Sequence, residues 1–443
     1  MDNNVQAAPP RAEQGHGGGA ASGLDSEVSL MQMRRVVVTG MGVVAPNGIG
    51  VGPFWNSLVD GQSGVKRIKH FDVSSYPSQI AGIVSDFDAT DYIDPKTAKR
   101  LSRFAHLAFA ASRMAIEDSN IDFSLEDPFR VGVFVGTAIG GADVIEIQHN
   151  IFMERGLKRI SPYAVVGIST HSASGLVSCE FNLKGPSSTL ASGCNTGLDT
   201  ICTAYNAIRL KDAEIAVVGT GEAPITPYGH ALFCAAGFLS KENAAPANAL
   251  KPYSLRADGM VLGEGGGSII LEELQHALKR KAKIYGEIVS YSALNEAFDL
   301  FGVETNCATM TQNFKQALKK GNLDITEIDY ISAHGNGLLP YDIAETQSIK
   351  ETFGEWAYEI PVTSLKPITG HSLSSTGLYQ TISSLLSIRH GIVPPTLNVE
   401  PLAPECDLNY VPSHSLKRQI NTVLINAHGF GGRLSTLIVR RYF

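Results

Sequence analysis

Short runs of apolar residues alternate along this chain with longer stretches in which apolar positions recur at helical spacing. Eight runs rich in β-branched residues predict buried strands, at residues 34–40, 131–136, 214–219, 268–271, 284–290, 330–333, 361–364 and 422–426. Five stretches predict helices, at residues 99–118, 198–210, 309–320, 343–353 and 376–388. Because the strands show little polar alternation, we expect an α/β fold in which helices cover both faces of the sheets.

A further strand precedes Cys194, the most informative residue of the chain. Residues 185–191 (GPSSTLA) predict a short buried strand, residues 192–197 (SGCNTG) predict a tight turn, and a helix follows. At such a strand-to-helix junction, unpaired backbone N–H groups and the helix dipole favour negative charge. We therefore expect a lowered thiol pKa and a sulfur exposed as a nucleophile. The alternative is a buried structural cysteine.

Other strand ends carry polar or glycine-rich turns. His334 follows one strand in the sequence HGNG, and Glu345 comes shortly after it; Lys366 and His371 follow the next strand, five residues apart. Phe430 lies in the loop HGFGG after the last predicted strand. Taken singly, each residue is as well explained by a buried histidine, a surface charge or a core aromatic. Together, turns at strand ends in two halves of the chain indicate a duplication whose polar groups meet in one crevice.

Composition narrows the class of protein. The chain has 443 residues, 44% of them hydrophobic, and a formal net charge of −7, with no block of basic residues. We therefore expect no nucleic-acid or membrane partner, and no apolar stretch approaches the roughly 20 residues of a membrane span. Six scattered cysteines without CxxC spacing argue against zinc and disulfides and suit the cytoplasm. Residues 1–32, rich in Ala, Gly, Pro and Gln, predict a disordered extension.

In their order and spacing, these motifs resemble those of the β-ketoacyl-acyl-carrier-protein synthases, condensing enzymes of the thiolase-like superfamily. The sequence SGCNTGLD around Cys194 is most similar to catalytic ketosynthase subunits of type II polyketide systems, with fatty-acid elongating synthases close behind. The resemblance implies a thiolase-like duplicated αβαβα layered fold, with two similar halves and mixed five-stranded sheets. We expect the N-terminal half over residues 33–275 and the C-terminal half over residues 276–443.

The resemblance also implies a role for each candidate residue. Cys194 would take an acyl chain from the phosphopantetheine thiol of an acyl-carrier protein (ACP). His334 and His371 would hold the carbonyl of the malonyl thioester as CO₂ leaves and an enolate forms. Lys366 and Glu345 would pair behind the histidines and fix their tautomers.

Further implied contacts concern the oxyanion and the substrate. Backbone N–H groups of Cys194 and Phe430 would form the oxyanion hole, and Phe430 would act as a gate between the acyl pocket and the malonyl site. Substrate contacts would fall on Asn336, Gly429 and Phe233. No cofactor and no metal is expected.

The chain departs from the family pattern at several positions. Most relatives carry Thr at the positions of Asn336 and Leu338, where hydroxyls hold the pantetheine amides; Asn336 can still form a hydrogen bond, whereas the Leu338 side chain cannot. His428 stands where Phe is usual, and Arg433 and Leu434 also differ. These changes favour a specialised pathway.

The implied function is a β-ketoacyl-ACP synthase that condenses an acyl chain with malonyl-ACP in a type II polyketide or specialised fatty-acid pathway. Two alternatives stay open: a catalytically silent partner subunit that determines chain length, and a housekeeping fatty-acid elongation synthase. The implied partners are ACP, malonyl-ACP, and a second subunit in a homodimer or heterodimer.

Overall fold

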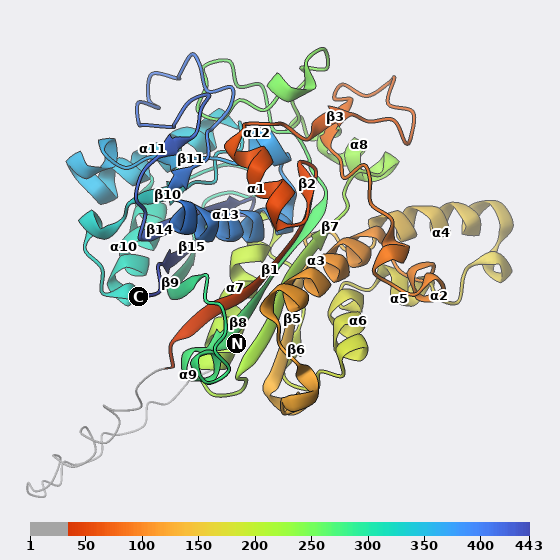
Figure 1. Ribbon diagram of the computed structural model, residues 1–443. Coiled ribbons are helices and arrows are strands. Elements are labelled where there is room, and N and C mark those ends of the chain that lie inside the picture. The colour runs from red at the N-terminus through yellow and green to blue at the C-terminus, as the bar shows by residue number, and fades with distance from the viewer. Residues whose placement is uncertain (1–33) are drawn as a thin grey trace, which may run out of the picture. The chain divides into compact units, whose positions relative to one another are not determined.

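The computed structural model describes residues 34–443, whose main strands join into one mixed sheet (Figure 1). These strands are β1 (Val36–Ala45), β2 (Gly48–Ile49), β5 (Val131–Gly136), β6 (Ser187–Ser188), β7 (Ile215–Glu222), β8 (Gly265–Glu273), β9 (Gly286–Asn295), β10 (Tyr330–Ser332), β11 (Val362–Thr363), β14 (Thr422–Gly429) and β15 (Arg433–Arg440). Their order is β11-β10-β14-β15-β9-β1-β8-β7-β5-β6, with β2 paired to β1. The extension predicted over residues 1–32 lies outside the described residues.

One strand order occurs twice in this sheet. Numbered along the chain, β1, β5, β6, β7 and β8 are arranged 3-2-4-5-1, and β9, β10, β11, β14 and β15 repeat that arrangement. In each set the second strand is parallel to the third and fourth, and the fifth is antiparallel to both of its neighbours. The two five-stranded sets join edge to edge through β1 and β9. The predicted duplication is confirmed; the residue boundary between the halves stays a prediction.

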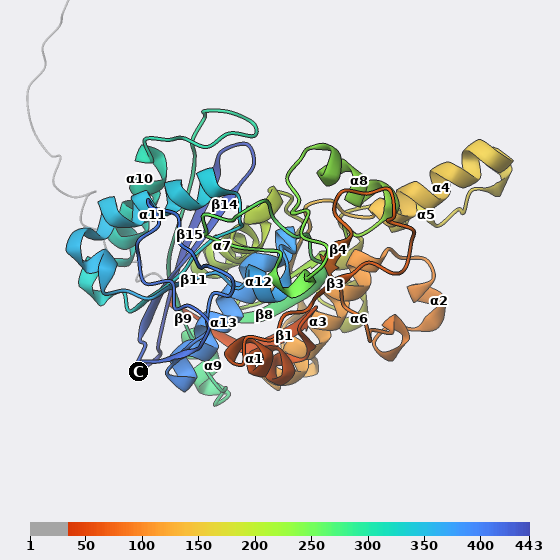
Figure 2. The same cartoon turned by 90° about the horizontal axis from the view of Figure 1, so that it is seen from above.

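Helices form layers outside and between the two halves of the sheet (Figures 1 and 2). The outer helices are α3 (Arg103–Ser119) and α6 (Ser172–Phe181) on the first half, and α10 (Ala308–Gly321) and α11 (Leu339–Phe353) on the second. The central helices α7 (Thr196–Arg209) and α13 (Thr376–His390) pack against each other and against strands of both halves. Residues 376–388 are all buried, as expected for a helix enclosed on every side.

The central helices approach most closely where each of them begins. A methyl group added to Gly197 would lie 2.6 Å from the carbonyl oxygen of Ser374 and 3.0 Å from Cα of Gly377. Only glycine permits this contact between the first turns of α7 and α13. The turns that precede the two helices, one with Cys194 and one with His371, are thereby held side by side.

Most predicted elements are present, but three differences matter. The predicted strand at residues 185–191 is reduced to β6, a half-exposed pair at the edge of the sheet, because it has only β5 as a neighbour. β15 was not predicted, yet it lies in the sheet between β14 and β9. Helices α1 (Val51–Val59), α4 (Ala142–Arg155) and α8 (Pro227–Ala235) were not predicted either.

Shorter elements complete the connections: β3 (Val65–Arg67), β4 (Ile80–Gly82), β12 (Ile392–Val393), β13 (Leu416–Lys417), α2 (Pro95–Ala98), α5 (Ala164–Ile168), α9 (Leu274–Lys279) and α12 (Lys366–Thr369). Within residues 34–443, no helix combines the length and the apolar character needed to cross a membrane.

Candidate active site

Cys194 lies in the 3₁₀ turn Gly193–Asn195, which leads directly into α7. Side chains from the first turns of this helix hold the turn. The Ser192 hydroxyl donates to Oδ2 of Asp199 (2.5 Å), and the Ser192 backbone N–H donates to Oγ1 of Thr196 (2.8 Å). The position of the sulfur is therefore fixed relative to the start of α7.

The Cys194 sulfur contacts a histidine from the other half of the chain. Nε2 of His371 lies 3.1 Å from Sγ. The backbone N–H of His371 donates to the carbonyl of Val261 (2.7 Å), and Nδ1 lies 3.2 Å from the hydroxyl of Thr376, the first residue of α13. Because a hydroxyl both donates and accepts, Thr376 can partner either neutral tautomer of the ring.

His334 lies beside this pair, with its ring centroid 5.4 Å from that of His371 and the two rings nearly perpendicular. The Lys366 ammonium donates to the backbone carbonyl of His334 and lies 3.4 Å from Nδ1. At the other ring nitrogen, Nδ2 of Asn336 lies 3.3 Å from Nε2, while Oδ1 of Asn336 accepts from the Leu338 backbone N–H (2.9 Å). The structure thus brings Cys194, His334, Lys366 and His371 together.

Burial controls the charges in this cluster. It lowers the pKa of both His334 and His371 well below the usual histidine value, and the Lys366 charge lowers both further. Both rings are therefore neutral near pH 7. Burial also lowers the pKa of Lys366 to about 8, opposed by the negative charge of Glu345.

The expectation of an exposed sulfur with a lowered thiol pKa is wrong. Cys194 is 7% exposed, and burial raises the pKa of its thiol to about 11, with Glu222 adding to the rise. Lys366 and the backbone N–H groups of Cys194 and Phe430 offset only part of this effect. Loss of solvation outweighs the helix N-terminus, so the resting sulfur is a protonated thiol.

The expected direct pairing of Lys366 with Glu345 is also wrong. Within residues 34–443 the two form no ion pair; instead, the Glu345 carboxylate binds the loop that carries His334. Oε1 accepts from the His334 backbone N–H (2.6 Å), and Oε2 accepts from the Gly335 backbone N–H (2.9 Å) and the Tyr253 hydroxyl (3.0 Å). Glu345 shapes this loop and acts on Lys366 through space.

Aromatic side chains surround the sulfur on its apolar side. Phe430, in the turn between β14 and β15, stacks on Phe238 with ring centroids 4.5 Å apart, and its ring lies 5.9 Å from that of Tyr341. Cys194 belongs to a buried apolar cluster against which both Phe430 and Phe233 pack. Phe233 and Phe430 therefore lie where an acyl chain on the sulfur would be enclosed.

Close packing explains why residue 429 is a glycine. A methyl group added to it would lie 2.4 Å from Oδ1 of Asn195 and 3.6 Å from the backbone nitrogen of Cys194. This close approach brings the end of β14 against the turn that carries the sulfur. The same approach places the backbone N–H of Phe430 near the Cys194 sulfur.

Three residues of the site received no role from the sequence: Asp342, Tyr341 and His428. Asp342 accepts the backbone N–H of Asn336 (3.0 Å) and supports the same loop as Glu345; burial raises the pKa of Asp342 to about 7. The spacing of Asp342 and Glu345 on one helix face was the available signal. The rings of Tyr341 and His428 contact each other at a tilted angle, with ring centroids 4.7 Å apart, and no short-range pattern indicates that contact.

The comparisons with known proteins agree with this arrangement. Residues 33–277 match the family model for the N-terminal domain of beta-ketoacyl synthases, and residues 285–400 match the model for the C-terminal domain. The chain belongs to the beta-ketoacyl synthase family. No group of three or more His, Cys, Asp or Glu in the described part of this synthase is placed to hold a metal ion.

Relatives of this beta-ketoacyl synthase are named as 3-oxoacyl-[acyl-carrier-protein] synthases and as polyketide beta-ketoacyl synthases. A 3-oxoacyl-[acyl-carrier-protein] synthase 2 of Coxiella burnetii is 39% identical, covering 93% of this chain and 100% of the relative. A ketosynthase bound to the hexaketide, in complex with its type II PKS acyl-carrier protein, superposes with a TM-score of 0.86 at 33% identity, over 93% of this chain and 100% of that one. The ishigamide ketosynthase/chain length factor superposes with a TM-score of 0.87 at 27% identity, over the same shares.

Proposed function

We propose that this synthase is a catalytic condensing subunit that uses ACP-bound substrates and joins an acyl chain to a malonyl unit in two half-reactions. The observation that carries the proposal is the convergence of Cys194, His371 and His334 in one buried cluster. These residues come from both halves of the chain. The two histidine rings are neutral, and each has one ring N–H that can donate a hydrogen bond.

In the first half-reaction, the Cys194 sulfur attacks the acyl thioester of the carrier. The new C–S bond forms as the bond to pantetheine breaks, and the thiol proton leaves with the pantetheine sulfur. Because the thiol is protonated at rest, His371 relays that proton through Nε2, 3.1 Å away. The N–H groups of Cys194 and Phe430 receive the oxyanion of the tetrahedral intermediate.

In the second half-reaction, His334 and His371 hold the thioester oxygen of the malonyl unit. Lys366 can only donate, so its position at Nδ1 of His334 favours the ring proton on Nε2. The Asn336 amide nitrogen at Nε2 is itself a donor and cannot accept a hydrogen bond from that N–H, whereas the malonyl oxygen that displaces it can. CO₂ leaves, and the enolate carbon attacks the Cys194 thioester. The new C–C bond forms as the bond between the acyl carbon and Sγ breaks, and the released thiolate regains a proton from solvent through His371. Neutral donors stabilise the enolate oxygen without protonating the carbon.

Thr376 allows His371 to serve both half-reactions. During acylation Nε2 must accept the thiol proton, whereas during decarboxylation Nε2 must donate to the malonyl oxygen. The Thr376 hydroxyl accepts a hydrogen bond from the Nδ1–H in the first case and donates a hydrogen bond to Nδ1 in the second.

The silent-partner alternative requires an inactive nucleophile, and the contact between Cys194 and His371 disfavours it. The relatives bear names from both pathways, and the ketosynthase in complex with its type II PKS carrier supports a type II system for this chain. We place it in the cytoplasm, paired with an identical or related subunit. Its six free cysteines suit that reducing compartment.

The test separates the half-reactions by intact-mass measurement. Wild-type protein mixed with an acyl-ACP should gain the acyl mass, and Cys194→Ala should gain none. His334→Ala and His371→Ala should lose malonyl decarboxylation while acylation persists in part. An unreactive Cys194 in the wild type would favour the silent partner, and wild-type condensation rates in both histidine variants would remove their roles.

A further inference from the structure

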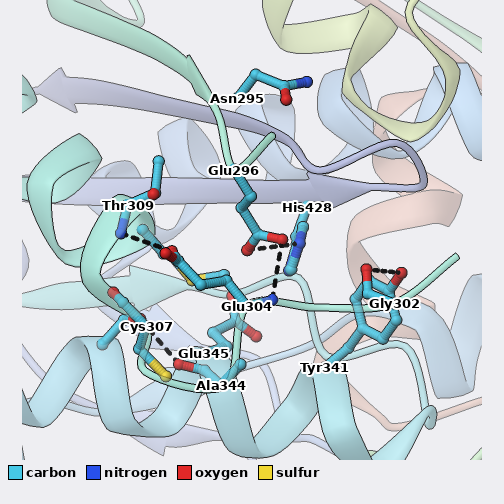
Figure 3. A network of polar contacts seen from close by, with 12 residues as sticks. Asn295, Glu296, Gly302, Glu304, Cys307, Thr309, Tyr341, Ala344, Glu345 and His428 are labelled. Carbon is cyan, nitrogen blue, oxygen red and sulfur yellow. Dashed lines mark hydrogen bonds and ion pairs between the residues drawn. The ribbon is translucent and has the colours of Figure 1, made fainter. Parts of the chain in front are cut away.

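A third histidine, paired with a glutamate, lies next to the site and has no role in the two half-reactions. Nε2 of His428 lies 3.2 Å from Oε1 of Glu296, and both side chains are 1% exposed. Figure 3 shows the ring and the carboxylate turned toward each other, with Tyr341 alongside. The His428 ring centroid is 6.4 Å from that of His334.

Hydrogen bonding in this pair is incomplete. The contact between His428 and Glu296 is short enough for an ion pair but is not aligned as a hydrogen bond. As a result, Oε1 of Glu296 and both ring nitrogens of His428 are buried without a hydrogen-bond partner. Such buried polar atoms are uncommon in native proteins and call for an explanation. A ligand that accepts a hydrogen bond from the ring would supply the missing partner.

The rest of the Glu296 side chain is well anchored. Oε2 of Glu296 accepts the backbone N–H of Glu304 (3.2 Å), and the Glu296 backbone N–H donates to the carbonyl of Gly432 (2.8 Å), as the network in Figure 3 illustrates in part. His428 lies on β14, next to Gly429. The pair is therefore held in place by the sheet and by the turn that carries Phe430.

Resting on the proposed function, we propose that His428 binds the free carboxylate of the malonyl thioester and that Glu296 holds the His428 ring in position for it. One methylene separates that carboxylate from the thioester carbon held at His334. The methylene must face the acyl group on Cys194, which lies on the His371 side. The carboxylate therefore points away from the sulfur. Apart from His371, the imidazole ring next to His334 is that of His428, with ring centroids 6.4 Å apart.

This contact belongs to the bound substrate and is lost during the reaction. The bond between the methylene carbon and the carboxylate breaks, its electron pair forms the enolate, and CO₂ leaves without any proton transfer to or from His428. An interaction with a departing carboxylate stabilises the ground state more than the transition state. Its removal should therefore raise KM for the malonyl thioester without lowering kcat.

The matched substrates are a malonyl and a butyryl thioester of the same carrier, one with the carboxylate and one without. The variants are His428→Phe, which keeps a flat ring, and the double variant with Glu296→Gln, which leaves no unpaired buried charge if the single variant folds poorly. His414→Phe makes the same exchange at an exposed position and is the control for replacing a histidine with phenylalanine. Malonyl decarboxylation and Cys194 acylation are followed separately.

We expect KM for the malonyl thioester to rise about ten- to hundredfold in both His428 variants, the usual value of a hydrogen bond to a charged group, with kcat and butyryl transfer unchanged. KM for the malonyl thioester should be higher in the single variant than in the double one, because the Glu296 carboxylate that the single variant keeps repels the carboxylate of the substrate. An unchanged malonyl KM, or equal losses in both half-reactions, would overturn this role and leave the proposed function intact. A wild type with neither half-reaction would overturn both.

Discussion

A methyl group on Gly429 would meet Oδ1 of Asn195 at 2.4 Å, so the end of β14 touches the turn that carries the sulfur. Asn195 cannot easily retreat, because its side-chain amide donates to the carbonyl of Ala427 and the hydroxyl of Ser435, both at 2.9 Å. This contact joins the two halves of the chain at the point where their chemistry meets. It makes the geometry of the site depend on a position without a side chain.

Gly429→Ala should therefore disturb the site more than the fold. Overpacking of this kind costs about 1–3 kcal/mol of unfolding free energy, and displacement of the Cys194 turn should slow acylation by at least about tenfold. Thermal unfolding and intact-mass kinetics measure the two effects. Gly175→Ala, in α6 with open space around the added methyl, is the matched control; it should leave acylation unchanged and raise the unfolding free energy by up to about 1 kcal/mol. Normal acylation in Gly429→Ala would contradict the close contact.

Malonyl decarboxylation should decline as the pH rises above about 8. The pKa of Lys366 is lowered to about 8 by burial, so above that pH the amine loses the positive charge that favours the enolate next to His334. Lys366→Met should lose roughly ten- to hundredfold in rate at pH 7, the range for hydrogen bonds to charged groups, and should show no decline in this pH range. A decline of equal size in Lys366→Met would assign the titration to another group.

Thr376→Val should slow both half-reactions by about three- to tenfold, the usual value of one neutral hydrogen bond. Valine keeps the shape of threonine but removes the hydroxyl that partners Nδ1 of His371 in both tautomers. Single-turnover rates of acylation and of malonyl decarboxylation check this expectation. Loss of only one of the two rates would mean that the Thr376 hydroxyl supports His371 in that half-reaction alone.

A structural histidine outside the site should make stability pH-dependent. His276 lies between Glu272 (2.6 Å) and Glu126 (3.0 Å), and the hydrogen bond to Glu272 raises the pKa of His276 above its usual value. The folded state then binds the proton more tightly, so the added stability is full below pH 6.5 and fades as the pH rises through the raised pKa. His276→Ala should cost about 1.5–3 kcal/mol near pH 6 and less near pH 9. An equal loss in melting temperature at both pH values would contradict this assignment.

Local patterns along the chain predicted the repeated strands and the ordered motifs well. They failed where long-range packing decides. β15 was not predicted although its residues 434–439 (LSTLIV) form an apolar run rich in β-branched residues; its place as an inner strand depends on pairing with β14 and β9. The expected thiolate at Cys194 followed from the helix N-terminus alone, whereas burial by distant segments sets the pKa of the thiol. The contact of Glu345 with the His334 loop and the approach of Glu296 to His428 likewise require the folded chain.

In the proposed mechanism, Cys194 carries the acyl chain inside its apolar cluster. Six free cysteines compete for an acyl label, so peptide mapping of the protein after incubation with an acyl-ACP can show which of them carries it. A single acylated peptide containing Cys194 should form in the wild type and be absent from Cys194→Ala. Acylation at Cys179, Cys202 or Cys234 instead, or an equal acyl gain in Cys194→Ala, would contradict it.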